Sequence, residues 1–429
     1  MGRATTSSFV LTMPLRYEPW QRDKLDTMFK ASNFMYNDLV ADRKPACEQM
    51  LRTRKWKQFP KQIQALKEVI KKAIPNSDER KALEEELRNV RLERTAFQRK
   101  YGMTEYDFHA IIQKWRKHYS GLVNTNVAQK IATSVWQKFS AYIFGKGEEL
   151  KFQPWQEHHS IEGKDNKCGI RFRDHALYIG KMRIPVAPAV TQYEKDALKN
   201  EVKYCRIVRT PWKDGWLYKV QLIMKGDAPV KVDPETGELL HPLGNGRVGM
   251  DIGTQTVANV SETMVRLEEL ADKVHPTNAE IRRLNRAMDR SRKATNPDFF
   301  NKDGTVKTID KVDKSRLDRK GRRNWNRSKR YKRLEQRRRY LYAKMTRTKQ
   351  CQHNEMTNRF LAAGNVFYTE KMDYRALQKR AKKQEPKPGE KLKRRKRFGK
   401  SLATKSPATF TKIMEEKVRR QGGEFHYIN

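Results

Sequence analysis

The excess of positive charge is the feature that most constrains this chain. It carries 93 Lys and Arg against 50 Asp and Glu, a formal net charge of +43 over 429 residues. Self-repulsion on this scale destabilises a compact state unless a polyanion neutralises it. Phosphate backbones do so and release condensed counterions, which favours binding. We therefore expect nucleic acid as the partner rather than an anionic membrane, which would require a basic amphipathic helix with a clean apolar face.

Composition and cysteine spacing narrow the class further. The chain holds 8 Trp, 16 Tyr and 17 Phe, too many aromatic residues for a disordered protein. No long apolar run is present, so neither a membrane span nor a secretory signal is expected. The four cysteines stand far apart without a CxxC pair, which favours reduced thiols in a cytoplasmic protein and no zinc site within this chain.

The first half of the chain has the pattern of a β-rich block with a helical insertion. A strand is predicted over 8–18, within 1–19, and helices over 20–144. Residues 145–245 change to short alternating runs separated by turns, the clearest being a hairpin around Asp214-Gly215. We expect the first strand to join these later strands in a small barrel.

Two segments define the helical insertion best. The run Pro75 to Glu79 has a small polar cap followed by acids, which is typical of a helix start. A last helix is predicted from about 126 to 144. Its buried face is expected to consist of Val127, Ile131, Val135, Phe139 and Tyr142.

The second half, 246–429, combines strands with long basic segments. A hairpin is predicted over 247–261, then a helix over 262–293. The apolar residues that indicate this helix are Met264, Leu267, Leu270 and Val274. Residues 365–370 read as a strand, and the chain ends with a helix from Pro407 and a strand after Gly422-Gly423.

Positive charge is densest from Lys314 to Lys349, which holds 17 Lys and Arg and two acids, Asp318 and Glu335. We predict one long basic helix, about 314–360, that contacts phosphates. Its docked face is expected to comprise Tyr331, Leu334, Leu341, Tyr342 and Met345. The expected phosphate contacts are Arg316, Arg319, Arg322, Arg323, Arg330, Arg333, Arg337 and Arg338. A second basic stretch, 379–400, is predicted to be a loop because it contains two prolines and a glycine.

Two acids stand at unusual places on predicted strands. Asp251 lies between Gly249 and Gly253, opposite the apolar face of its strand, and Glu370 closes the strand 365–370. If the two strands are neighbours in one sheet, the carboxylates converge in the manner of a Mg²⁺ site. Two such ions clamp the attacking and leaving oxygens of a phosphodiester. The alternative is a turn acid and a surface acid without a shared role.

These motifs resemble those of a known family. GMDIGTQTVANVS resembles the first motif of a RuvC-type nuclease domain in the form found in TnpB, the transposon-encoded RNA-guided nucleases, and compact type V CRISPR effectors are similar. NVFYTEKMDYRALQKR resembles the second motif of that family. Three further segments extend the resemblance along the whole chain. They are the basic segment between the two motifs, NTNVAQKIATSVWQKFSAYIFGKGEELKF before the β-rich block, and SLATKSPATFTKIMEEKVRRQGGEFHYIN at the end.

The resemblance implies an α+β multidomain fold and assigns roles to its parts. A β-barrel wedge domain (1–19 and 145–245) would grip the guide RNA scaffold, and a helical recognition lobe (20–144) would hold the guide–target heteroduplex. An RNase H-like (RuvC) domain would occupy 246–429, incomplete in this chain. Asp251 and Glu370 would be its first two metal ligands.

The implied activity is Mg²⁺-dependent RNA-guided DNA cleavage. The expected partners are a guide RNA and a target double-stranded DNA with a short flanking motif. The protein would act as a monomer or as a homodimer on one RNA, in the cytoplasm of a prokaryote and associated with the nucleoid. No membrane partner is expected.

One departure from the family leaves alternatives open. The family has a third motif with another aspartate, usually after a zinc ribbon, and this sequence ends at Asn429 before either. We expect an active enzyme that binds two Mg²⁺ ions when the third acid is present. The alternative is a catalytically inactive RNA-guided DNA-binding protein, resembling a repressor. DIGTQT also resembles the phosphate-binding turn of actin-like ATPases, but a second glycine-rich turn is missing from NVFYTEKMD.

Overall fold

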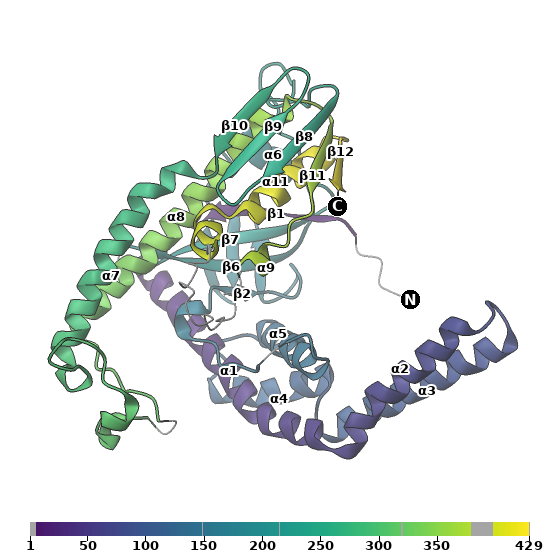
Figure 1. Cartoon of the computed structure of the whole chain (residues 1–429), viewed down its shortest axis with the longest axis vertical. Coiled ribbons are helices and arrows are strands. Elements are labelled where there is room, and N and C mark those ends of the chain that lie inside the picture. The colour runs from purple at the N-terminus through teal and green to yellow at the C-terminus, as the bar shows by residue number, and fades with distance from the viewer. Residues whose placement is uncertain (1–5, 148, 214, 319–320, 379–397, 429) are drawn as a thin grey trace, which may run out of the picture. The chain divides into compact units, whose positions relative to one another are not determined.

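The computed structural model describes residues 6–147, 149–213, 215–318, 321–378 and 398–428 (Figure 1). These form two compact units. Unit 1 comprises Met1–Arg209 and Tyr218–Ala228, and unit 2 comprises Thr210–Leu217 and Pro229–Asn429. No helix in the described ranges is both long enough and apolar enough to cross a membrane.

Helices make up most of the first part of unit 1, as predicted. They are α1 (Pro19–Arg52), α2 (Arg54–Lys72), α3 (Asp78–Lys100), α4 (Glu105–His118) and α5 (Thr125–Ile143), followed later by η1 (Trp155–Glu157) and α6 (Gln192–Leu198). The predicted start of α3 is confirmed, because the Ser77 side chain accepts a hydrogen bond from Arg80 N at 3.2 Å. Such a cap satisfies one of the backbone donors that a helix leaves unpaired at its N-terminus.

The buried face of α5 is largely as predicted. Val127, Ile131, Val135 and Phe139 are buried, whereas Tyr142 is only partly buried. The Phe108 ring of α4 packs against Phe139 with 5.0 Å between centroids. Asn124 caps α5 by accepting from Val127 N at 2.9 Å, so the helix starts where a side chain replaces the missing backbone acceptor.

The β-rich part of the first half of the chain forms two sheets, and it belongs to unit 1 apart from Thr210–Leu217. Its strands are β1 (Ser8–Pro14), β2 (Ser160–Glu162), β3 (Ile170–Arg173), β4 (Ala176–Ile179), β5 (Met182–Pro185), β6 (Val202–Trp212) and β7 (Gly215–Lys225). One sheet has the order β1-β7-β6-β2 and the other β3-β4-β5. β6 and β7 are neighbours in the predicted hairpin, whose turn residue Asp214 lies outside the described residues.

The first strand joins the later strands, as the sequence predicted. β1 pairs antiparallel with β7 along its whole length, from Ser8 opposite Lys225 to Pro14 opposite Lys219. A single bridge between Leu15 and Val186 then links this sheet to the second one. The two sheets are thus joined end to end, and closure into a barrel stays a prediction.

Unit 2 is built on a five-stranded mixed sheet of order β10-β9-β8-β11-β12 (Figure 1). The strands are β8 (Arg247–Ile252), β9 (Thr256–Val260), β10 (Val265–Glu269), β11 (Val366–Glu370) and β12 (Glu424–Ile428). β8, β9 and β10 are antiparallel neighbours, and β11 runs parallel to both β8 and β12. The predicted hairpin 247–261 and the strand 365–370 are therefore confirmed.

The helices of unit 2 are α7 (His275–Thr295), α8 (Lys329–Leu361), α9 (Tyr374–Gln378), α10 (Gly399–Lys405) and α11 (Pro407–Arg420). Short 3-10 turns lie at Asp272–Val274, Pro297–Phe299, Ile309–Lys311 and Lys314–Arg316. The core of the sheet packs apolar residues of one face, such as Met250 and Phe367, against Phe360 of α8 and Phe410 of α11. One face of the sheet is thus covered by these two helices.

Two predictions for unit 2 are wrong in their boundaries. The helix expected over 262–293 is the strand β10 followed by α7, because Ser261 and Thr263 form a turn that folds β10 back on β9. Leu267, assigned to a buried helical face, is 74% exposed on this strand. The apolar alternation of Val265 and Leu267 fits a strand as well as a helix, and pairing with β9 decides between them.

The basic helix is also shorter than predicted, since α8 begins at Lys329. Before it, Asp318 Oδ1 accepts from Arg322 N at 2.9 Å and Leu317 forms a β-bridge with Arg323. Ser328 then caps α8 by accepting from Tyr331 N at 3.1 Å. These local bonds compete with helix formation.

A small second core joins α7 to α8, with Ile281 and Leu284 packed against Leu341 and Met345. Tyr342, predicted on this face, is 46% exposed, and Tyr340 packs there instead. Of the second basic stretch, 379–397 lies outside the described residues, including both of its prolines; Gly399 and Lys400 begin α10 rather than continue a loop.

Candidate functional site

The register of the sheet brings Asp251 and Glu370 to neighbouring positions. In the parallel pair β8–β11, Tyr368 lies opposite Gly249 and Thr369 opposite Met250. The same register continued by one residue sets Glu370 beside Asp251. Neighbouring strands lie about 4.8 Å apart. The two acid-bearing strands are thus adjacent, as the sequence suggested.

Both carboxylates stand on the face of the sheet that α8 and α11 leave open. Along β8, Met250 and Ile252 are buried while Asp251 is exposed. Along β11, Thr369 is buried while Glu370 is exposed. Gly249 keeps this face clear, because a Cβ added there would meet nothing nearer than Val260 O at 4.0 Å. A ligand therefore has room to approach the two acids.

Neither acid has a protein partner for its side chain in the described part of the chain. Asp251 and Glu370 make no hydrogen bond or ion pair there. No group of three or more His, Cys, Asp or Glu that suits a metal ion occurs among the described residues. The pair supplies hard oxygen donors with open surroundings, which fits a Mg²⁺ ion that keeps several waters.

Tyr374, which the sequence analysis did not single out, lies beside this pair. It starts α9, and its Oη donates to Ile252 O at 3.4 Å, at the end of β8. Burial raises the pKa of Tyr374, and the charge of Asp251 raises it further. Tyr374 therefore stays a protonated donor next to the carboxylates. The only feature of the sequence that points to Tyr374 is its position four residues after Glu370.

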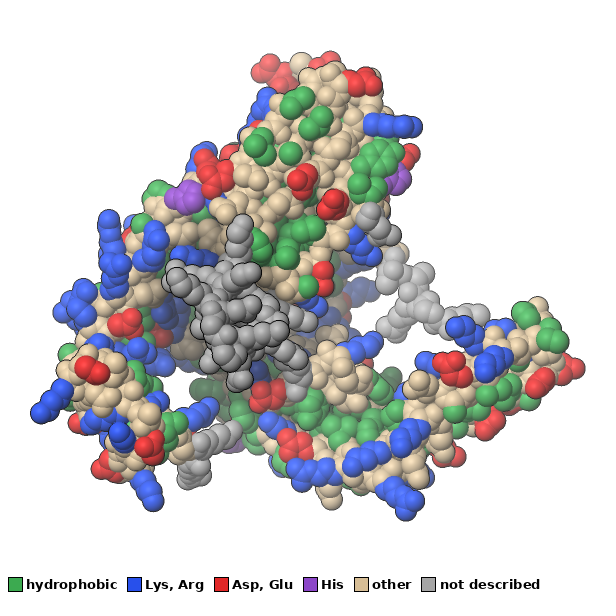
Figure 2. All heavy atoms as spheres, in the orientation of Figure 1, with side chains coloured by type: hydrophobic (Ala, Val, Ile, Leu, Met, Phe, Trp, Pro, Cys, Tyr) green, Lys and Arg blue, Asp and Glu red, His purple; other side chains and the backbone are tan. Residues whose placement is uncertain are grey.

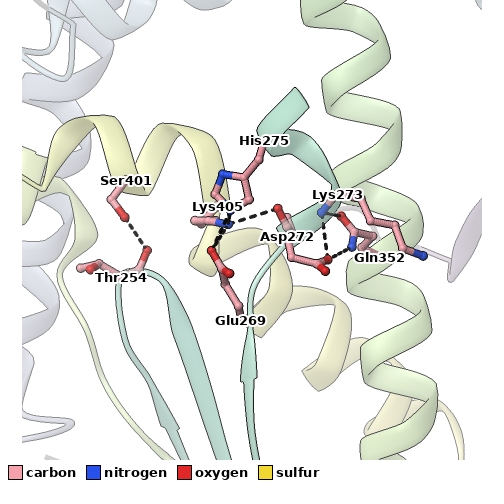
Figure 3. Close-up of polar contacts among 9 residues, drawn as sticks. Thr254, Glu269, Asp272, Lys273, His275, Gln352, Ser401 and Lys405 are labelled. Atoms are coloured by element: carbon pink, nitrogen blue, oxygen red, sulfur yellow. Dashed lines mark hydrogen bonds and ion pairs between the residues drawn. The ribbon is translucent and has the colours of Figure 1, made fainter. Parts of the chain in front are cut away.

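Helix α10 fixes the turn that follows Asp251 (Figure 3). Ser401 Oγ donates to Thr254 O at 3.1 Å. At the other end of α10, Lys405 Nζ contacts Glu269 Oε1 at 2.6 Å and Ala271 O at 3.2 Å, and His275 Nε2 lies 3.3 Å away. Lys405 is only 2% exposed, so a buried lysine ties α10 to the exposed Glu269 at the end of β10.

The same corner of the sheet is also tied to α8 (Figure 3). Gln352 Oε1 accepts from Lys273 N at 3.2 Å, and the Gln352 amide donates to Asp272. The hydrogen bond from Gln352 lowers the pKa of Asp272, and those from Lys405 and His275 lower the pKa of Glu269. Asp272 and Glu269 thus have hydrogen-bond partners that stabilise their charged forms.

The arginines predicted to contact phosphate fall into three groups. Arg319 lies outside the described residues. Arg316, Arg322 and Arg323 bond within the 296–328 loop, to Asn296, Asp318 and Lys307 O respectively. These three arginines organise the loop that precedes α8.

The other four lie on α8. Arg337 pairs with Glu280 of α7 at 2.6 Å, and Arg338 donates to Asn285 Oδ1 at 3.1 Å. Arg330 and Arg333 are exposed and make no hydrogen bond, ion pair or ring contact in the described chain. Spaced three residues apart, they share one side of the helix. These two are available to phosphates without breaking an existing bond.

The loop before α8 is folded around aromatic rings. Trp325 packs against Phe299 with 4.7 Å between centroids, and the Arg292 guanidinium lies 5.0 Å from the Trp325 ring. Asn296 is fully buried and accepts from Asn326 N at 2.8 Å. The densest cationic segment is therefore partly a folded cap on the α7–α8 hairpin.

No protein-family model and no curated protein matches the chain. Among solved structures, it is similar to one in a cryo-EM structure of the Cas12f1-sgRNA-target DNA complex, with 9% identity and a TM-score of 0.41 over 98% of this chain and 89% of that chain. It is also similar to one in a cryo-EM structure of a CRISPR-Cas12f ternary complex, with 10% identity and a TM-score of 0.27 over 95% of this chain and 72% of that chain. These values are low, so function is argued from the residues of this chain.

Proposed function

We propose that the protein is an RNA-guided DNA endonuclease whose active site contains Asp251 and Glu370. The observation that carries this proposal is the register of β8 and β11, which brings two exposed, unpaired carboxylates together. In a chain with 93 Lys and Arg, many of which show on the face drawn in Figure 2, such acids have many potential partners. An arrangement of like charges without a compensating cation is unfavourable unless a ligand supplies one.

The order of the strands supports an RNase H-like core for this site. Three antiparallel strands are followed by two parallel ones, so that the first strand of the sheet, β8, lies centrally beside β11. The acids stand on the two central strands, on the open face. A polynucleotide laid across that face meets both carboxylates at once.

Asp251 and Glu370 would hold Mg²⁺, with two ions expected where a third acid joins them. When bound, the metal activates the attacking water and stabilises the leaving oxygen of a phosphodiester. Tyr374 is placed to donate a hydrogen bond near Asp251. Ser401 and Lys405 position the turn after Asp251 through α10.

The basic hairpin α7–α8 would hold the phosphate backbone. Arg330 and Arg333 are the contacts we propose on α8, because their guanidinium groups are not engaged elsewhere in the described chain. For unit 1 we propose that its sheets grip a guide RNA scaffold and its helices hold the guide–target heteroduplex, with base pairing reading the target DNA. One or two copies of the chain would bind each RNA.

A second candidate is a catalytically inactive RNA-guided DNA-binding protein. It is favoured by the number of acids that gather at the site, which is two in the described chain. It explains the charge of +43 equally well. It gives no reason for two adjacent carboxylates to remain without cations.

Cleavage of guide-matched DNA tests the proposal. The chain is purified with its RNA, the RNA is sequenced, and a duplex matching its guide is incubated with Mg²⁺ or with EDTA. We expect cutting with Mg²⁺ only, and none from Asp251→Asn, while that variant still binds RNA and DNA. Cutting by Asp251→Asn would overturn the assigned site, and guide-dependent binding without any cutting would support the second candidate.

A further inference from the structure

A polar groove lies in unit 1 between α5 and the segment that leads into β2. Its volume is about 330 Å³, and residues 153–162 form the wall that faces α5. This volume is at the lower end of ligand pockets, roughly 300–1,000 Å³. The groove is therefore large enough for one small ligand.

The groove wall differs in chemistry from most of the protein surface. Thr133, Ser134 and Gln137 line it from α5, and Ser160 lines it from the opposite side. These are hydroxyl and amide groups in a chain of which 33% of residues are charged. Such neutral groups bond to phosphate and sugar as well as to base edges, and they can satisfy the donors and acceptors of an unstacked base.

The far wall is held in one conformation by α1. Asn37 Oδ1 accepts from Gln153 N at 2.8 Å, and Asn33 Nδ2 donates to Gln153 O at 2.9 Å. The Gln153 side chain donates to Glu157 O at 3.2 Å. Its Oε1 is then left to face His158 Nδ1 at 3.1 Å. The groove is thus preformed rather than dependent on a ligand to order it.

This network fixes the protonation of His158, a lining residue that is 6% exposed. Because Gln153 Oε1 accepts at Nδ1, the proton of the neutral ring lies there and Nε2 is an acceptor. Burial lowers the pKa of His158 to about 4, with Arg209, His159 and Lys138 adding to the shift. Within the described residues, His158 Nε2 and the Oη of Tyr36, another lining residue, have no hydrogen-bond partner. A ligand in the groove can supply partners for both atoms.

The charges around the groove favour an anionic ligand. Lys130 lines it and lies 2.9 Å from Glu162, whose other oxygen accepts from Arg206 at 2.7 Å. One carboxylate thus stands between two cations. Glu157 is a second acid in the lining, and Lys138 and Arg209 add positive charge close to His158.

We propose that this groove binds a single nucleotide whose base is turned out of its strand, with the base against the hydroxyl and amide side chains and the phosphate on the Lys130 side. Unstacked bases are read by hydrogen bonds to their edges in this way. The inference rests on nucleic acid being the partner, as in the proposed function, and is independent of the cleavage step.

Calorimetric titration of the full chain with the four nucleoside 5′-monophosphates, and with inorganic phosphate, tests this. We expect saturable binding with one nucleotide favoured at least about tenfold over the weakest, and weaker binding of phosphate. Gln137→Leu, which removes a base contact, and Ser134→Trp, which fills the groove, should each weaken the favoured nucleotide about tenfold. Gln129→Leu is the matched control on α5, because Gln129 is not among the lining residues, and it should change the affinity less than twofold.

Several results would overturn the groove assignment: no saturable binding, equal affinity for all four nucleotides and phosphate, or equal losses in Gln137→Leu and Gln129→Leu. The same preparations are titrated with single-stranded RNA to keep the two proposals apart. A wild-type chain that binds RNA but no nucleotide refutes the groove alone. A chain that does not bind RNA refutes the proposed function.

Discussion

In unit 2, the acids of the α7–α8 hairpin and two acids of the five-stranded sheet differ in whether they pair with a cation. In the hairpin, Glu280, Asp289 and Glu335 each form an ion pair with an arginine. On the open face of the sheet, Asp251 and Glu370 have no such partner in the described chain. The hairpin has few acids, and these pair with its arginines. On the sheet, two carboxylates lie side by side without a cation in the described chain.

The carboxylates that pair with arginines stabilise the hairpin, whereas the two unpaired carboxylates of the sheet repel each other. Like charges on directly neighbouring strands are destabilising by about 0.2–1 kcal/mol. The surplus of Lys and Arg, 93 against 50 acids, makes partners available. The paired acids of the hairpin contribute to its packing, whereas the role we propose for the unpaired sheet acids is to bind a cation.

The largest expected effect concerns the two acids of the parallel strands. Glu370→Gln should reduce guide-dependent cleavage about 1,000-fold, or about 4 kcal/mol, because a metal ligand is lost. Glu424→Gln is the matched control, since Glu424 lies on the adjacent strand β12 and contacts His426 instead. It should retain cleavage within twofold in a single-turnover assay. Similar losses in both variants would make the sheet face, rather than the pair, responsible.

Lowering the pH should destabilise the part of α8 that packs in the core of the sheet. His353 is fully buried there, and burial lowers its pKa from 6.5 to about 4, with the charge of Lys349 adding to the shift. The folded state therefore binds fewer protons than the unfolded state between these values. Its contribution to stability is full above pH 6.5 and is lost as the pH falls, by about 3 kcal/mol at pH 4.

Urea unfolding followed by circular dichroism at pH 7 and pH 4 measures this loss. His353→Leu should remove about 3 kcal/mol of the pH dependence, because no proton is then taken up at that position. The exposed His426 of the same unit supplies the control, His426→Leu. An unchanged pH dependence in His353→Leu would show that another group carries it.

Glu269, at the end of the edge strand β10, does have a cationic partner, Lys405. Lys405→Met keeps the length of the side chain but removes the contacts of Nζ with Glu269 and Ala271 O. We expect unfolding to become easier by about 2 kcal/mol, the usual contribution of charged hydrogen bonds. Thermal unfolding measures this, with Lys412→Met on α11 as the control, since the exposed Lys412 pairs with the exposed Glu416. Equal shifts would place the stabilisation elsewhere than in the contacts of the buried Lys405.

The free arginines of the hairpin should determine binding to nucleic acid more than the paired ones do. Arg330→Gln combined with Arg333→Gln should weaken RNA binding about tenfold and reduce the salt slope by about two, one per phosphate contact. Arg338→Gln combined with Arg339→Gln is the control, because Arg338 bonds Asn285 and Arg339 pairs with Glu335. Fluorescence anisotropy at several salt concentrations compares them. A steeper change in the control would reverse the assignment.

The smallest effect tests repulsion between the two sheet acids directly. Without divalent metal, Asp251→Asn should stabilise the chain by about 0.5 kcal/mol, because the like-charge contact with Glu370 is relieved. Addition of Mg²⁺ should raise the thermal midpoint of the wild type and not that of the variant. Destabilisation by Asp251→Asn in the absence of metal would mean that the carboxylate has a structural partner.

Sequence patterns predicted the elements of the sheet that carry the acids. The alternation around Asp251 and the apolar run before Glu370 both indicated strands, and both are present. The same sequence patterns could not identify β10, because Val265 and Leu267 are exposed and their spacing fits both a helix and a strand. The start of α8 was missed because side chains such as Asp318 and Ser328 bond the nearby backbone.

The roles of the individual arginines could not be predicted from the sequence. Nothing in the run 314–349 separates Arg333 from Arg337, yet one is free in the described chain and the other is bound to Glu280. Glu280 lies 57 residues away, on a helix that packs beside α8. Tyr374 was overlooked for the same reason, since its contact with Ile252 O is made across the sheet.

Charge, alternation and capping are properties of residues close together in the chain, so the surplus of positive charge, the two acid-bearing strands and the helical insertion could be predicted from the sequence. Three features could not: the adjacency of Asp251 and Glu370, the lack of a partner for Arg330 and Arg333 in the described chain, and the polar groove between α5 and β2. These depend on the register of strands and on the packing of helices distant in sequence, where many weak contacts act together to select one arrangement.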